Sequence, residues 1–137
     1  MTNTVEQYVP DRDEWISLQP MNAGRQLGGL VAMGDVLYAI GGYERAYSPS
    51  VERIDMRMGK GWEYVCPMIH PRMGFGALVH GTTILVNGGF AAAGNGITVM
   101  SSMERYEQRM DKWEEMPQLN YPRRRFGFVK MKLYNKT

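Results

Sequence analysis

The stretch Val36-Leu37-Tyr38-Ala39-Ile40-Gly41-Gly42 is an apolar run that ends in a glycine doublet. It recurs as Ile84-Leu85-Val86-Asn87-Gly88-Gly89, and the second doublet lies 47 residues after the first. Short apolar runs bounded by turn residues are typical of buried β-strands. A glycine doublet lets such a strand turn sharply against a neighbouring segment, because glycine has no Cβ. The chain therefore contains an internal repeat built from strands.

Three tryptophans extend this repeat over almost the whole chain. Trp15, Trp62 and Trp113 are 47 and 51 residues apart, and we expect all three to pack at the junctions between repeats. Each tryptophan follows a recurring glutamate and precedes a recurring arginine: Glu6, Glu52 and Glu104, then Arg25, Arg72 and Arg123. A guanidinium can satisfy several loop carbonyls at once. We therefore expect a structural role for these arginines, with the glutamates pairing with them or with backbone donors.

The chain resembles the kelch-repeat family, in which a glycine doublet closes one strand, a tyrosine lies on the next and a tryptophan on the last. Tyr8 and Tyr106 supply the tyrosine, and Ile54 replaces it in the middle copy. A period of roughly 50 residues is typical of one kelch blade. The resemblance implies an all-β fold, a partial kelch β-propeller with two complete four-stranded antiparallel blades flanked by partial blades. Since a closed ring needs about four blades or more, we expect these 137 residues to form an arc of a longer or truncated protein.

The family letters its strands A to D from the propeller axis to the rim, which gives a predicted layout. Residues 1–19 would hold the C and D strands of one blade, 20–66 and 67–115 one complete blade each, and 116–137 the start of a further blade and a basic tail. The expected strands are 4–9 and 14–18, then 25–33, 36–41, 51–55 and 61–66, then 74–80, 83–88, 101–107 and 112–115, and a lone A strand at 125–131. The B–C connections at 43–49 and 90–100 are expected to be loops.

Composition excludes several classes of function. The net charge is only +2, so neither nucleic acid nor a membrane surface is expected as a partner, and the basic run after Arg123 is interpreted as a loop and a solvated tail. The sequence has no apolar run long enough to span a membrane, and residues 1–6 lack the features of a signal peptide. Cys66 is the single cysteine, which suits a reducing compartment, and we expect a cytoplasmic protein.

Catalytic and metal-binding signals are weak. His70 and His80 are the only histidines, and their spacing fits no metal site. Some kelch-type propellers are copper oxidases with tyrosine, cysteine and histidine ligands, which raises Tyr64, Cys66 and His70 as candidates, but their positions at a blade rim favour a structural Cys66. We therefore expect no catalytic residues, no metal, no cofactor and no enzymatic activity.

The resemblance to kelch-like substrate adaptors of ubiquitin ligases implies a protein or peptide ligand, acidic or mixed, on the face formed by the B–C and D–A loops. The contact positions there are the aromatic after the doublet and the residue two beyond the loop arginine, which here are Tyr43 and Phe90, then Leu27, Gly74 and Arg125. Of these and their neighbours we expect Tyr43, Arg45, Phe90 and Arg125 to contact the partner. An actin-binding protein and an enzyme of the sugar-oxidase or sialate-isomerase type remain alternatives, and self-association through open blade edges is also expected.

Overall fold

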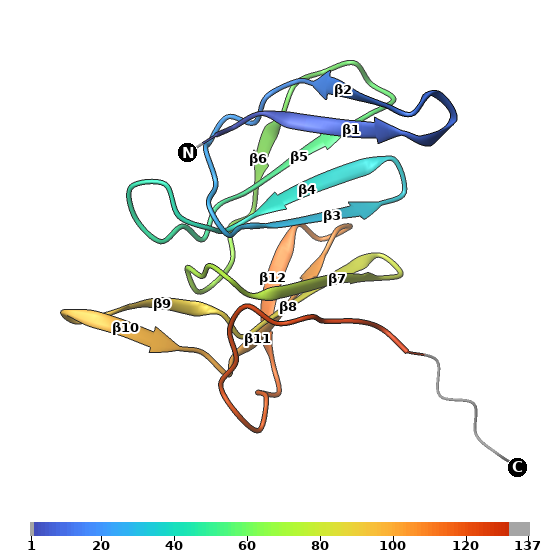
Figure 1. The fold of residues 1–137 in the computed structure, drawn as a ribbon. Coiled ribbons are helices and arrows are strands. Elements are labelled where there is room, and N and C mark those ends of the chain that lie inside the picture. Colours follow the sequence, from blue (N-terminus) through green and yellow to red (C-terminus); the bar gives the residue numbers. More distant parts are fainter. Residues whose placement is uncertain (1, 132–137) are drawn as a thin grey trace, which may run out of the picture.

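The computed structural model describes residues 2–131, which form two four-stranded antiparallel sheets and two hairpins (Figure 1). The first sheet has the order β3-β4-β5-β6, with bounds Gly29–Met33, Val36–Ile40, Val51–Asp55 and Glu63–Val65. The second has the order β7-β8-β11-β12, with bounds Gly76–His80, Thr83–Asn87, Met103–Glu107 and Lys112–Met116. Each sheet is one blade, and the predicted all-β partial propeller is confirmed.

The two hairpins flank these blades in different ways. β1 (Val5–Val9) and β2 (Glu14–Leu18) are joined by a 3-10 turn at Pro10–Arg12 and supply the C and D strands that precede the first blade. β9 (Phe90–Ala93) and β10 (Gly96–Val99) form a hairpin that projects from the second blade, where a loop was predicted. The prediction of a loop at 90–100 was therefore wrong. Gly94 has a φ of 55°, and a glycine there allows the two-residue turn that joins Ala93 to Gly96 in a hairpin.

The predicted lone strand at 125–131 is absent as a regular strand. These residues still follow the course expected of an A strand, because the amide of Arg125 donates to the carbonyl of Gly74 at 2.6 Å and Phe126 and Phe128 pack against Gly76. A strand is defined by a hydrogen-bonded neighbour, and none of the described residues pairs with this segment as a B strand.

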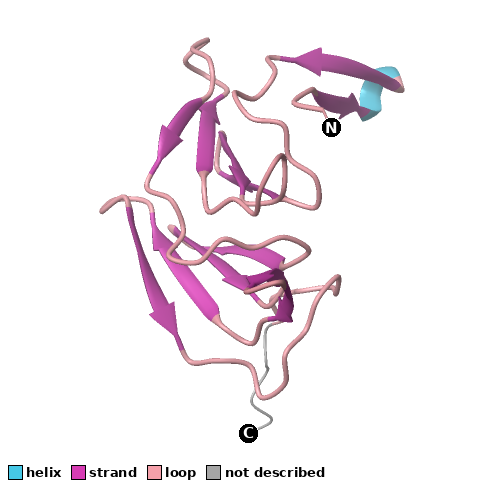
Figure 2. Cartoon of the chain, turned by 90° about the vertical axis from the view of Figure 1, so that its left-hand side faces the viewer, coloured by secondary structure: helices cyan, strands magenta, loops and turns pink. Residues whose placement is uncertain are grey.

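The core lies between successive blades, which stack face to face (Figure 2). Tyr38 of the first blade meets Tyr106 of the second with ring centroids 5.8 Å apart, and Trp113 is 4% exposed in the same cluster. Trp62 is 8% exposed and packs with Val5 of β1. Each of these tryptophans is covered by the preceding unit of the arc.

Trp15 is 68% exposed, so the expectation that all three tryptophans are buried was wrong for this one. Its ring lies 5.3 Å from that of Tyr8 on the face of the β1–β2 hairpin that points away from the first blade. Within residues 2–131 no preceding unit covers that face. The repeat predicted the position of Trp15 in its blade, but burial also needs a neighbouring sheet.

Replacing a glycine can cost stability through a left-handed backbone and through a clash of the added Cβ, and Gly34 and Gly88 differ in the second of these. Both have a φ near 60°, but a Cβ on Gly88 would lie 2.5 Å from the carbonyl oxygen of Arg123, whereas a Cβ on Gly34 would have no heavy atom within 4 Å. We expect Gly34→Ala to lower the free energy of unfolding by about 1–2 kcal/mol through the left-handed backbone alone. Gly88→Ala should cost roughly 1–3 kcal/mol more, because the backbone must also move. Urea unfolding measures both, and equal losses would contradict the close packing of residues 117–123, the third D–A loop, against Gly88.

Candidate functional site

The loops that carry the candidate site are held by buried ion pairs. Arg72, in the loop between the two blades, places Nη2 2.7 Å from Oε1 of Glu104 on β11, and both side chains are completely buried. Nη1 of Arg72 donates to the carbonyls of Gly88 at 2.8 Å and Ser102 at 3.1 Å. Burial lowers the pKa of the Arg72 guanidinium, and the hydrogen bond and charge of Glu104 oppose that shift. The pair fixes the loop to the second blade.

Arg25 and Glu52 repeat this arrangement one blade earlier. Arg25 Nη2 lies 2.9 Å from Glu52 Oε1, and Nη1 donates to the carbonyls of Gly41 and Ser50. The expected pairing of loop arginines with strand glutamates is therefore observed twice. Arg123 differs, because its side chain is exposed and it pairs with no carboxylate among residues 2–131.

An aromatic row connects the loops at one end of the arc. The rings of Tyr43 and Tyr47 are 5.5 Å apart, and those of Tyr47 and Phe90 are 6.3 Å apart, both in edge-to-face contact. The guanidinium carbons of Arg124 and Arg125 lie 5.5 and 5.6 Å from the centre of the Phe90 ring. Cations over an aromatic face are attracted by its quadrupole. We call the surface made by residues 43–49, 90–99, 124 and 125 the loop face.

The four predicted contact residues lie on or under this face. Tyr43 is half-buried and Arg45 is exposed, and both border a hollow of about 250 Å³. Arg125 is exposed, with a φ of 50°. Phe90 is 3% exposed, so its ring supports the two arginines and offers little surface of its own.

Sequence reasoning missed two members of the site, Tyr47 and Arg124. Tyr47 lies in the same B–C loop as Tyr43, but only the folded loop brings its ring between Tyr43 and Phe90. Arg124 precedes Arg125 directly, and its position over Phe90 depends on the packing of the third loop against the second blade. A second aromatic within one loop was the available signal for Tyr47.

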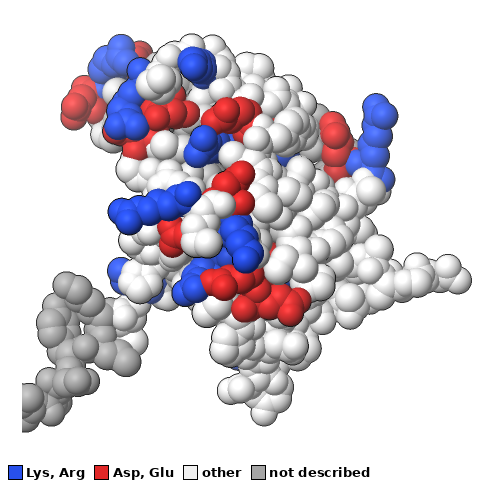
Figure 3. Space-filling model, turned by 180° about the vertical axis from the view of Figure 1, so that it is seen from behind, with Lys and Arg blue, Asp and Glu red and all other residues white. Residues whose placement is uncertain are grey.

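The β9–β10 hairpin adds an uncharged surface to the loop face. Residues 90–99 contain no charged side chain, and Ile97 at the hairpin is 60% exposed. Figure 3 shows lysines and arginines interspersed with acidic side chains over much of the surface in this view, while the projecting hairpin is free of both. Exposed apolar and aromatic groups beside arginines are the groups that protein interfaces favour.

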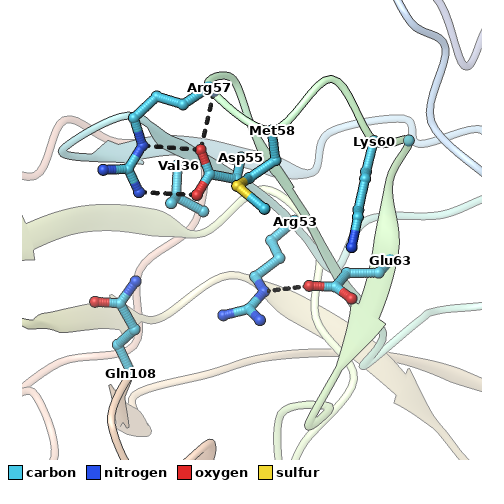
Figure 4. A pocket seen from close by; sticks show the side chains of 9 residues that line it. Val36, Arg53, Asp55, Arg57, Met58, Lys60, Glu63 and Gln108 are labelled. Carbon is cyan, nitrogen blue, oxygen red and sulfur yellow. Dashed lines mark hydrogen bonds and ion pairs between the residues drawn. The ribbon is translucent and has the colours of Figure 1, made fainter.

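A pocket of about 350 Å³ lies at the opposite end of the blades, among the A–B and C–D turns (Figure 4). Arg53 donates to Glu63 at 2.9 Å, and Arg57 donates to Asp55 at 2.9 Å. The hydrogen bonds from Arg57 lower the pKa of Asp55 to about 2. Both arginines are already paired with carboxylates, and Lys60 also lines this pocket.

The residues considered for copper face solvent or contact other groups. Tyr64 is 56% exposed, His70 Nε2 lies 2.8 Å from Oε1 of Glu115, and the Cys66 thiol is near the carbonyl of Pro67. Among residues 2–131, no three histidine, cysteine, aspartate or glutamate side chains form a group that could hold a metal ion.

The described part of the chain contains no helix with the length and hydropathy needed to cross a bilayer.

Comparisons with known proteins agree with this architecture. The chain is 32% identical over 87 residues to Kelch-like protein 26 of Mus musculus, which covers 63% of this chain and 14% of the relative. It is 29% identical over 129 residues to Kelch-like protein 23 of Pongo abelii, which covers 91% of this chain and 21% of the relative. The chain thus spans less than a quarter of the length of these relatives.

A solved structure and a family model complete the comparison. The structure of YjhT superposes with a TM-score of 0.78 at 16% identity, covering 91% of this chain and 41% of that one, which shows a shared fold. The model of the Kelch motif matches residues 24–66 and 71–120, the segments that contain both four-stranded blades. With more than half of its residues matched in this way, the chain belongs to the kelch-repeat family.

Proposed function

We propose that the chain is a protein-interaction module that binds a protein or peptide on the loop face. The observation that carries this proposal is the aromatic row, Tyr43, Tyr47 and Phe90, with two arginines above Phe90. Aromatic and arginine side chains are the commonest anchors of protein interfaces. Membership of the kelch-repeat family, a class of protein-interaction modules, supports the same proposal.

The partner that this face suits is an acidic or mixed peptide. Arg45, Arg124 and Arg125 are exposed around the row, so carboxylates of a peptide would find guanidinium donors there, while its apolar residues would lie against the uncharged hairpin. In a longer protein this would be the substrate-recognition part of a kelch-like ubiquitin-ligase adaptor in the cytoplasm. Actin binding is the second candidate, and it would use the same face.

Loop-face substitutions test the binding proposal. Peptides would be selected on the wild-type chain from a random phage-displayed library, synthesised and titrated by calorimetry. Tyr43→Ala and Arg125→Ala are expected to weaken binding by about 2 kcal/mol or more, roughly thirtyfold, since each removes an anchor. Asp35→Ala, on an A–B turn at the other end of the blade, should leave the affinity unchanged. A larger loss of affinity for Asp35→Ala than for the other two variants would show that the loop face is not the binding site. Enrichment of peptides without acidic residues would exclude an acidic ligand.

We also propose that the exposed ends of the arc allow copies of the chain to associate. Trp15 is 68% exposed and Tyr8 is 41% exposed on the face that precedes the first blade. Aromatic side chains in equivalent positions, Trp113 and Tyr106, are buried between blades. An uncovered junction of this kind favours contact with another sheet.

A further inference from the structure

The three D–A loops of the chain, residues 19–25, 67–72 and 117–123, share one hydrogen bond in the same position. In the first, the amide of Met21 donates to the carbonyl of Asn3 at 2.8 Å; in the second, Met68 donates to Pro49 at 2.9 Å. The third loop has the same bond, from Leu119 to Ser101 at 2.8 Å. Each donor lies four residues before the loop arginine. The third loop is therefore preformed in the geometry of the other two.

The first two loops each bind one glutamate and one tryptophan of the following blade. In the second loop, the amides of Ile69 and His70 donate to Glu104 at 2.7 and 3.1 Å, beside the ion pair with Arg72. Trp113 Nε1 donates to the carbonyl of Cys66 at 2.9 Å.

The first loop makes the same contacts at the same spacing. Asn22 and Ala23 donate to Glu52 at 2.7 and 3.2 Å, and Trp62 donates to Gln19 at 2.8 Å. A D–A loop is thus a receptor for a carboxylate and an indole N–H.

The third loop presents this receptor to solvent. In the first two loops the carbonyl acceptor lies six residues before the arginine, and the amide donors lie three and two residues before it. In the third loop, counted from Arg123, these positions are the carbonyl of Pro117 and the amides of Asn120 and Tyr121. All four residues are exposed, and Tyr121 is 71% exposed. The loop is nevertheless docked on its own blade, because Gly89 donates to the carbonyl of Arg123 at 2.6 Å.

The other end of the arc presents the matching groups. Glu6 and Trp15 lie on the same outward face of the β1–β2 hairpin, in the register that Glu104 and Trp113 have on β11 and β12. In both hairpins the tryptophan is opposite a tyrosine, Tyr8↔Trp15 and Tyr106↔Trp113. Glu6 is exposed, and no arginine among residues 2–131 forms an ion pair with it. One end of the chain thus carries a preformed carboxylate receptor, and the other carries a carboxylate and an indole in matching register.

We propose that two copies of the chain associate head to tail, with Glu6 and Trp15 of each copy bound by the third D–A loop of the other. Glu6 would meet Arg123 and the amides of Asn120 and Tyr121, and Trp15 would donate to Pro117. Each copy supplies three C–D strand pairs, so two copies joined at both ends would supply six. Two such contacts would therefore close a ring within the typical range of about four to eight blades. The inference rests on the self-association proposed above and is independent of peptide binding on the loop face.

Charge reversal on the 137-residue chain tests this contact. Sedimentation velocity should show a dimer for the wild type, and Glu6→Arg or Arg123→Glu should each weaken it at least about thirtyfold by placing like charges together. Mixing the two variants should restore the dimer, because each contact then joins opposite charges. The matched controls Asp11→Arg and Arg109→Glu reverse exposed charges on C–D turns and should dimerise as the wild type does.

Each outcome of this experiment decides the inference. Both substituted side chains are exposed in the single chain, so circular dichroism should show unchanged strand content for every variant. A wild type that stays monomeric at all concentrations overturns the contact and assigns the end faces to another occupant, such as further blades of a longer chain. Single variants that still dimerise, or a mixture that does not, overturn it as well. Failure here would leave the loop-face titration with Tyr43→Ala unaffected.

Discussion

Arg72→Met is expected to lower the free energy of unfolding by about 3–5 kcal/mol, because it leaves the carboxylate of Glu104 buried without its cation. Two backbone carbonyls also lose their donors. Domains of this size are stable by only about 5–15 kcal/mol, so the loss is a large part of the total. Urea unfolding followed by tryptophan fluorescence, at a protein concentration that keeps the chain monomeric, measures it.

Arg105→Met is the matched control for this prediction. Arg105 pairs with Glu114 across two neighbouring strands, but both side chains are 41–50% exposed, and exposed pairs contribute about 0–1 kcal/mol. The double replacement Arg72→Met with Glu104→Met should be less destabilising than Arg72→Met alone, because no buried charge is left unpaired. Equal effects of Arg72→Met and Arg105→Met would show that the loop pair is not what holds the blades together.

Trp113→Ala is expected to cost about 3–5 kcal/mol, because it empties the junction between the two complete blades. The ring is 4% exposed, lies 5.1 Å from that of Tyr106 and donates to the carbonyl of Cys66. Without it the contact between the blades loses both apolar area and a hydrogen bond. Urea unfolding followed by circular dichroism should show a lower midpoint.

Trp15→Ala provides the comparison within the same repeat position. Because Trp15 is 68% exposed, we expect a loss of less than about 1 kcal/mol in the monomeric chain. The same substitution should weaken the head-to-tail dimer, so the two tryptophans separate stability within the chain from association between chains. A loss for Trp15→Ala equal to that for Trp113→Ala at low protein concentration would contradict the exposed position of Trp15.

Much of the architecture was predictable because the repeat supplies several copies of the same local pattern. Apolar runs that end at Gly41-Gly42 and Gly88-Gly89 predicted β4 and β8, and the strands on either side followed from the family pattern. The pairing of glutamates with loop arginines was also foreseen as one of two possibilities. These features depend on contacts between neighbouring repeats, and a repeated sequence encodes both sides of such a contact.

The sequence by itself determined that the chain is all-β, that its unit is a blade of about 50 residues, and where most strands lie, because strand pattern and glycine position are local properties. Only the tertiary structure decided burial. Trp15 and Trp62 have the same sequence context, but one is exposed and the other is buried, since burial requires a sheet on the far side. For the same reason Arg123 is exposed whereas Arg72 is buried, and residues 125–131 lack the neighbouring strand that would pair with them. Likewise, only folding brought Tyr47 and Arg124 to Phe90, because contacts between loops far apart in the chain leave no periodic signal.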